Sequence, residues 1–254
     1  MPTRRAVHTL VTALWIVAAC TAAQAATPKI GVAAAVKNNV QGIQGRTTRP
    51  LSTGSDVFTN ERIRTGENSL AQILFLDKTT LIMGARAELT LDKFVYSPRG
   101  TGQVVLNAVQ GAFRFVTGSQ NPRSYTINTP VGSLGVRGTV VEFLVAPSPT
   151  TPTIYTVYVI LIEGLASFKF QGRTHALTRR GDYFAVTSDG VSGPAPWNST
   201  VVNAGVTLPL FGWYFDGVFP DNGLLDPNII GIDQLDGIRQ QSLPPVNGCG
   251  RFCN

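Results

Sequence analysis

The chain has 254 residues, of which 43% are hydrophobic and 14% are charged, and its formal net charge at pH 7 is +6. This length allows a sizeable hydrophobic core and favours one main domain with a tail. No run of lysine or arginine exceeds two residues, as in the pair Arg179-Arg180. A nucleic-acid-binding surface, which needs a basic patch or stripe, is therefore not predicted.

The first 25 residues have the layout of a secretory signal peptide. Two arginines form a basic start, an apolar run follows over residues 7–19, and "AQA" ends at Ala25 as a small-residue cleavage site. Because the apolar run is too short for a stable anchor, we predict cleavage after Ala25 and a periplasmic or secreted protein without a transmembrane anchor. Lipidation of Cys20 in "VAAC" is an alternative, although valine stands where a lipoprotein box usually has leucine.

Residues 26–193 form a series of short β-type runs separated by turn residues, which we take as one domain. The run "SLAQILFL" at 69–76 is apolar on both faces, which is typical of a strand buried on both sides. In the run "AFRFVTG", Phe113 and Phe115 alternate with Arg114 and Val116, which is a period of two as in a strand. Helical periodicity is almost absent, so the pattern predicts an all-β architecture.

Two stretches depart from this strand pattern. The run "APSPTTPT" at 146–153 predicts an exposed loop between two long strands. Residues 194–254 form an irregular Pro/Gly-rich tail with aromatic clusters such as "LFGWYFDGVFP", which we expect to pack on the β domain or on a partner. The tail ends with Cys249 and Cys253, which are expected to form a small disulfide in an oxidising compartment. A zinc site is the alternative, but two thiols without nearby histidines leave the metal shell incomplete.

Three segments in the β region together resemble the FecR domain. They are "FTNERIRTGENSLAQILFLDKTTLIMGARAELTLDKFVY", "VLNAVQGAFRFVTG" and "YTINTPVGSLGVRGTVVEF". Their matching pieces follow the order of the family from about Asp56 to Phe143, which makes the resemblance specific. The residues that match the family motif are Thr65, Gly66, Asp77, Gly111, Phe113, Thr129, Pro130, Gly135, Arg137, Gly138 and Thr139.

The resemblance implies a periplasmic module built as a twisted, solenoid-like stack of short strands, with a sandwich-like stack as the alternative. It also implies signalling, because the domain is first known from the ferric-citrate regulator. In such regulators a cytoplasmic anti-sigma segment and one membrane helix precede the domain. The present sequence begins instead with the predicted signal peptide, so we do not expect direct control of a sigma factor.

The third of these segments crowds three glycines and a proline between β-branched residues. Pro130 prevents regular strand pairing at its nitrogen, and Gly135 and Gly138 allow backbone conformations closed to other residues. The stretch therefore predicts a strand, a sharp corner and a second strand. Arg137 is expected to donate hydrogen bonds to carbonyl groups freed at the corner, and a ligand-binding role is the alternative.

The sequence contains no recognisable catalytic constellation. His175 is predicted to be a strand-surface residue, because no "GxSxG" nucleophile motif accompanies it. Glu142, Glu163 and Asp182 are carboxylates that could flank a glycosidic bond, but nothing in the sequence pairs them. The aspartates of "DGVFPDNGLLDPN" lack the spacing of a calcium loop. We therefore predict no catalytic residue, no metal and no cofactor.

Three hypotheses for the function follow from these patterns. The first is an exported, non-catalytic module that binds an envelope protein or a cell-wall polymer, since site chemistry is absent and a fold alone supplies none. The second is an envelope signalling sensor that acts with separate membrane partners. The third is an exported enzyme that uses paired carboxylates.

Overall fold

The computed structural model describes residues 27–97, 102–148 and 150–197. Apart from the 3-10 helix η1 (Pro122–Ser124), every element in these ranges is a β-strand. The strands are β1 (Lys29–Lys37), β2 (Val40–Gln44), β3 (Thr47–Pro50), β4 (Asp56–Phe58), β5 (Arg62–Thr65), β6 (Leu70–Phe75), β7 (Thr80–Met83), β8 (Glu88–Val95), β9 (Gln103–Val116), β10 (Tyr125–Thr129), β11 (Gly132–Pro147), β12 (Tyr155–Phe170), β13 (Arg173–Leu177), β14 (Asp182–Val186) and β15 (Val191–Pro196). The predicted all-β class is confirmed.

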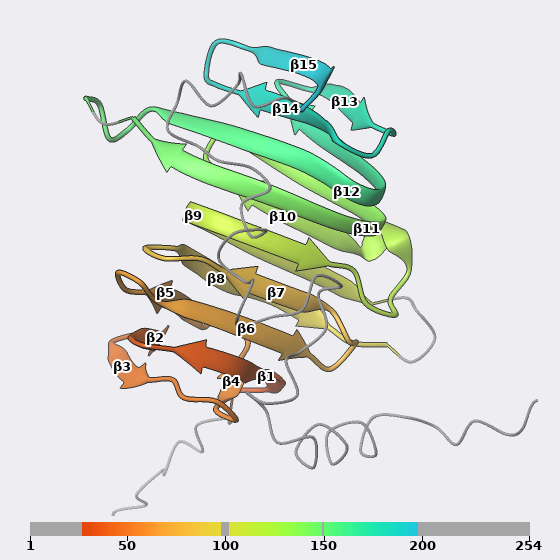
Figure 1. The fold of residues 1–254 in the computed structure, drawn as a ribbon. Coiled ribbons are helices and arrows are strands. Elements are labelled where there is room, and N and C mark those ends of the chain that lie inside the picture. The colour runs from red at the N-terminus through yellow and green to blue at the C-terminus, as the bar shows by residue number, and fades with distance from the viewer. Residues whose placement is uncertain (1–26, 98–101, 149, 198–254) are drawn as a thin grey trace, which may run out of the picture.

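The strands stack in two layers, which we call the front sheet and the back sheet (Figure 1). The front sheet has the order β4-β1-β6-β7-β9-β11-β12-β14-β15. The back sheet has the order β3-β2-β5-β8-β9-β10-β11-β12-β13. Strands β9, β11 and β12 belong to both sheets, each through a different half. The two layers are therefore joined through continuous strands.

The chain path around the two layers is solenoid-like in the middle of the domain. Strand β9 runs along the back sheet, turns the corner, crosses the front sheet and returns through η1 to β10. Strand β10 then pairs with the back half of β9 in parallel, with Tyr125 opposite Val104, while the other pairs are antiparallel. Parallel neighbours need a crossover connection, and here the front half of β9 is that crossover.

Three glycines form the corners at which the long strands pass between the sheets. Gly111 in β9, Gly138 in β11 and Gly164 in β12 have φ values of 106°, 57° and 82°, in the left-handed region that favours glycine. The register of β11 with β12 shifts on both sides of Val140, next to the Gly138 corner. The left-handed backbone predicted for Gly138 is therefore confirmed.

Two details of the predicted strand pattern differ from the structure. Gly135 does not have a positive φ and lies inside β11, opposite Ser167 of β12, so the expectation for this glycine is wrong. A Cβ at this position would lie 3.1 Å from the hydroxyl oxygen of Ser167. Strands β11 and β12 have 16 residues each, longer than a stack of short strands implies, because each crosses both sheets.

The hydrophobic core lies between the sheets and is rich in phenylalanine. The rings of Phe113 and Phe143 stack with centroids 4.9 Å apart. The largest fully buried side chains include Phe115, Phe168 and Phe184. Successive side chains of a strand point to opposite faces, so each sheet sends every second residue into this core.

The glycine at the β12 corner allows a direct test of the close packing there. A Cβ at Gly164 would overlap the carbonyl oxygen of Gly138, whereas a Cβ at Gly172, in the turn to β13, would meet no atom within 4 Å. Both residues have a left-handed φ, 82° and 79°. We expect Gly164→Ala to lower the free energy of unfolding by about 1–3 kcal/mol more than Gly172→Ala does, because only the former forces the backbone apart. Equal changes in urea denaturation would contradict this.

Candidate functional site

Several family-motif residues hold the corners of the fold through hydrogen bonds to the backbone. At the corner after β5, the hydroxyl oxygen of Thr65 donates to Gly84 O at 2.6 Å and accepts from Ala87 N at 2.8 Å. At the Gly138 corner, the hydroxyl oxygen of Thr139 donates to Leu165 O at 2.6 Å and accepts from Arg137 N at 2.8 Å. Both threonines are buried, so they satisfy backbone groups that would otherwise have no partner.

The predicted role of Arg137 is taken by Thr139. The side chain of Arg137 is exposed, and within the described part of the chain its guanidinium forms no hydrogen bond or ion pair. The corner groups are satisfied by the hydroxyl of Thr139, because this side chain is short enough to turn back onto its own corner. Arg137 is thus positioned towards solvent.

Asp77 is the centre of a second buried cluster, in the turn between β6 and β7. Its carboxylate accepts from Thr79 N at 2.9 Å, from the Thr79 hydroxyl at 2.8 Å and from the Tyr125 hydroxyl at 2.9 Å. Its backbone carbonyl accepts from Ser119 N at 2.8 Å. Burial raises the pKa of Tyr125 to about 12, so the phenol stays protonated and donates to Asp77. This cluster ties the β6–β7 turn to the segment before β10.

The other motif residues lie in strands and turns. Phe113 is fully buried in the core. Thr129 closes the turn between β10 and β11, where its hydroxyl donates to Gly132 O at 2.8 Å across Pro130. Gly66 lies at the corner between β5 and β6, and its N–H donates to Asn39 O at 2.8 Å. Cys249 and Cys253 lie outside the described residues.

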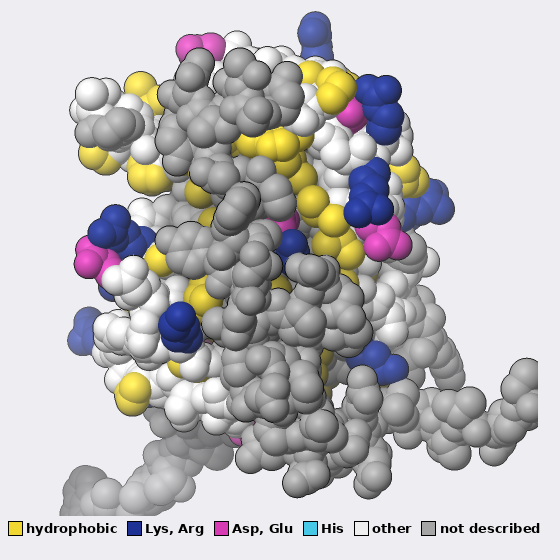
Figure 2. Space-filling view, in the orientation of Figure 1, with side chains coloured by type: hydrophobic (Ala, Val, Ile, Leu, Met, Phe, Trp, Pro, Cys, Tyr) yellow, Lys and Arg dark blue, Asp and Glu magenta, His cyan; other side chains and the backbone are white. Residues whose placement is uncertain are grey.

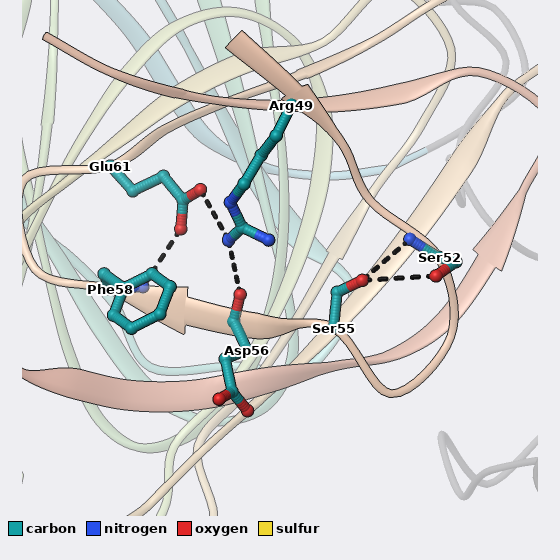
Figure 3. A network of polar contacts seen from close by, with 6 residues as sticks. All are labelled: Arg49, Ser52, Ser55, Asp56, Phe58 and Glu61. Atoms are coloured by element: carbon teal, nitrogen blue, oxygen red, sulfur yellow. Dashed lines mark hydrogen bonds and ion pairs between the residues drawn. The ribbon is translucent and has the colours of Figure 1, made fainter. Parts of the chain in front are cut away.

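A third polar network fastens the first strands of the domain (Figure 3). Glu61 is fully buried, and its carboxylate accepts from Arg49 Nη2 at 2.7 Å and from Phe58 N at 3.0 Å. The same Arg49 nitrogen donates to the carbonyl oxygen of Asp56, and the guanidinium lies 5.3 Å from the centre of the Phe58 ring. The network joins the ends of β3, β4 and β5, so it is structural.

The residues considered for catalysis have different environments. His175 is in β13, and its ring packs edge-on against the ring of Phe184 with the ring centroids 6.1 Å apart. Glu163 is exposed beside the β12 corner, and Asp182 is paired with Arg179 at 3.1 Å. The ranges described contain no group of three or more His, Cys, Asp or Glu side chains that could hold a metal ion.

The outer faces of the two sheets differ in chemistry, which singles out one of them as a candidate interaction surface. Paired residues across the front sheet form an outward row of Gln72, Ile82, Arg114, Glu142, Ile160 and Tyr183. The corresponding row across the back sheet is Arg62, Thr90, Asn107, Asn128, Ser133 and Lys169. The back row is polar throughout and suits contact with water, whereas the front row combines apolar side chains with an ion pair.

An ion pair lies at the centre of this outward face of the front sheet, which we call the front face. Nε of Arg114 donates to Oε1 of Glu142 at 2.8 Å across the β9–β11 pair. The Glu142 side chain is fully buried and the Arg114 side chain is 15% exposed. Leu144, Tyr158 and Ile162 lie around Ile160 and extend the apolar surface towards β14. Hydrophobic side chains also gather on the side of the molecule seen in Figure 2.

We expect the stability of the domain to depend strongly on both partners of the Arg114–Glu142 ion pair. Arg114→Met removes the Arg114 cation from the ion pair while the Glu142 carboxylate stays buried, and we expect a loss of about 3–5 kcal/mol in the free energy of unfolding. Adding Glu142→Leu to Arg114→Met should recover most of this loss, because it also removes the buried carboxylate. As a control, Lys29→Met breaks the exposed pair of Lys29 with Asp56 and should cost less than about 1 kcal/mol. Urea denaturation measures all three, and a small effect of Arg114→Met alone would contradict the prediction.

From the Asp77 cluster we expect the free energy of unfolding to depend on pH in the alkaline range. The pKa of Tyr125 is raised to about 12 in the folded chain from 10.0, so between these values the unfolded chain has lost a proton that the folded chain retains. The free energy of unfolding should therefore fall as the pH rises from about 10 through about 12, and should not depend on this group below that range. Burial also raises the pKa of Tyr158, so the contribution of Tyr125 is the difference between the wild type and Tyr125→Phe. Identical pH profiles of the two proteins would contradict the assignment.

Comparisons with known proteins show what this chain is similar to. No curated protein matches the chain. Two crystal structures of a "putative anti-sigma factor" from Parabacteroides distasonis ATCC 8503, at 2.50 Å and 1.65 Å resolution, have 11% sequence identity and a TM-score of 0.44. The alignments cover 56% of this chain, which spans 62% and 63% of the length of those chains.

The described ranges contain no helix with the length and apolar character needed to cross a bilayer.

The family model described as "FecR protein" matches residues 61–165. All the motif residues predicted from the sequence lie within this span, from Thr65 to Thr139. The FecR resemblance predicted from the sequence is therefore confirmed over residues 61–165.

Proposed function

We propose that this protein is an exported regulatory protein that takes part in envelope signalling through contacts with separate partners. The observation that carries the proposal is the FecR match over residues 61–165. The resemblance implies signalling for members of this family. The match favours the signalling hypothesis over the general binding module that stood first on the sequence alone. The family is associated with signalling, whereas nothing in the match indicates a particular binding partner.

The hydrogen bonds of the buried polar side chains indicate which parts of the domain are left for contacts with partners. The motif residues Thr65, Asp77 and Thr139 direct their polar atoms to the backbone or to neighbouring side chains. The buried Glu61 carboxylate is paired with Arg49. Groups occupied in this way hold the structure together, so contacts with partners fall to the outer faces and edges of the sheets.

The export part of the proposal rests on the sequence of the first 25 residues, which lie outside the described ranges. The basic start, short apolar run and "AQA" box favour a periplasmic or secreted location. In that compartment a signalling protein needs partners in the membrane to reach the cytoplasm. The partner in the proposal is therefore an envelope protein, and binding of a cell-wall polymer is the alternative outcome.

The proposal is tested by gene expression in the organism that encodes the protein. We expect deletion of the gene to change the transcript levels of a limited set of genes, and the wild-type gene to restore them. His175→Ala should restore them equally well, because the imidazole is not part of an assembled site. Glu163→Gln, which removes an exposed carboxylate, should behave in the same way.

The controls separate signalling from folding and from catalysis. Immunoblots must show equal amounts of each variant, since a misfolded protein would imitate a lost function. Gly164→Ala, which we expect to destabilise the fold, shows how a folding defect alone changes the transcript levels. Unchanged transcripts after deletion would contradict the signalling role. A well-folded His175→Ala or Glu163→Gln protein that fails to restore them would favour the enzyme hypothesis.

A further inference from the structure

The front face has the composition of an interior surface. Ile82 lies between the core residues Leu81 and Met83, and Ile160 lies between the core residues Val159 and Leu161. Because side chains alternate along a strand, Ile82 and Ile160 point away from the core between the sheets. Both are nevertheless buried. The strands of the described ranges form only the two layers, and none of them lies over this face.

The apolar side chains near Ile160 form a cluster separate from the main core. It consists of Ile160 with Leu144, Tyr158, Ile162, Tyr183 and Trp197. Ile160 is buried and the other members are half-buried, although no described strand covers them, and an apolar face of this kind on a soluble protein normally marks a contact surface. We therefore expect another segment or another molecule to cover the front face.

A polar atom on the same face points to the same conclusion. Gln72 lies in the outward row next to Ile82 and is 1% exposed. Its Oε1 atom is buried without a hydrogen-bond partner. A buried acceptor without a donor is unfavourable, so a segment that brings a backbone N–H to this position would stabilise the protein.

The described chain ends at this face. Trp197 packs edge-on against Tyr183 of β14, with ring centroids 5.1 Å apart. Its N–H donates to Gly181 O at 2.8 Å, which fixes the backbone at the edge of the front sheet. The residues that follow Trp197 therefore start beside the apolar cluster.

The sequence beyond this point contains an apolar segment that suits the face. Residues 206–219 read "VTLPLFGWYFDGVF" and include five aromatic side chains and one charged residue, Asp216. A segment with this many large apolar side chains and so little charge is unlike a solvated, disordered linker. Pro209 and the glycines at 212 and 217 disfavour an additional regular strand or helix, and are compatible with an irregular chain lying across a sheet.

The linker before this segment is long enough to reach the face. The eight residues between Trp197 and Val206 can span up to about 30 Å when extended. The front face from β14 to β6 crosses five strand spacings, or about 24 Å at the usual distance between strands. The segment can therefore lie over any part of the outward row.

We propose that residues 206–219 of this chain dock on the front face and cover Ile82, Ile160 and the Arg114–Glu142 pair. The tail then acts as a third layer that removes the apolar surface from water and excludes solvent from the ion pair. This inference does not depend on the signalling proposal, because it concerns only contacts within one chain.

Hydrogen exchange of the full chain, followed by mass spectrometry of its peptides, tests the docking. In the wild type we expect the amides of residues 206–219 to exchange at least about tenfold more slowly than in a variant with the segment released. Ile82→Lys and Ile160→Lys each place a charge under the segment and should release it. Val105→Lys is the matched control, because Val105 points outward from β9 on the back sheet, and it should leave the exchange unchanged.

A variant in the tail keeps the test valid if the lysine substitutions disturb folding. Trp213→Glu leaves the β domain unaltered and should both speed exchange in residues 206–219 and increase the binding of an apolar fluorescent dye. Sedimentation must show the oligomeric state. Rapid exchange of the segment in the wild type would overturn the proposal, as would protection that appears only in a dimer, since a second copy would then be the occupant.

Discussion

The passage of three strands through both sheets is the constraint on which the rest of the structure depends. Because β9, β11 and β12 each contribute to the front and back layers, the sheets cannot separate or slide without breaking continuous strands. The corners that make this possible need left-handed backbone at Gly111, Gly138 and Gly164. At Gly111 a Cβ would lie 2.5 Å from the Cα of Ala87, so the neighbouring chain leaves no room for a side chain. The phenylalanine core is aligned between the sheets by these fixed corners.

This constraint explains why the family motif describes a fold more than an activity. A sharp corner frees backbone donors and acceptors from the strand ladder, and burial makes it unfavourable to leave them unpaired. Thr65 and Thr139 satisfy such groups with one hydroxyl each, and Asp77 connects two turns through Thr79 and Tyr125. Residues used in this way have little capacity left for a ligand. The outer faces and edges of this chain are therefore the parts of the domain with side chains that the corners do not use.

The outer faces of the front and back sheets differ in chemistry. An antiparallel sheet in a two-layer domain usually presents one apolar face to the core and one polar face to water. The back sheet follows this pattern, with Asn128 donating to Asn107 at 2.8 Å on its outer side. The front sheet is apolar on both sides in its central strands, and its ion pair between Arg114 and Glu142 is largely withdrawn from solvent. A sheet of this kind is a middle layer, which is the physical basis for assigning a covering segment to it.

Sequence alone determined the features that depend on local patterns. The period-two runs and turn residues predicted the all-β class, "SLAQILFL" indicated a strand apolar on both faces, and the glycine beside Arg137 indicated a left-handed corner. Tertiary structure decided which distant groups meet. Tyr125 reaches Asp77 across 48 positions and Arg114 pairs with Glu142 across 28, and neither contact has a local signal. The same reason accounts for the errors at Gly135 and Arg137, because the strand register and the neighbouring Thr139 hydroxyl, which no single segment encodes, set their surroundings.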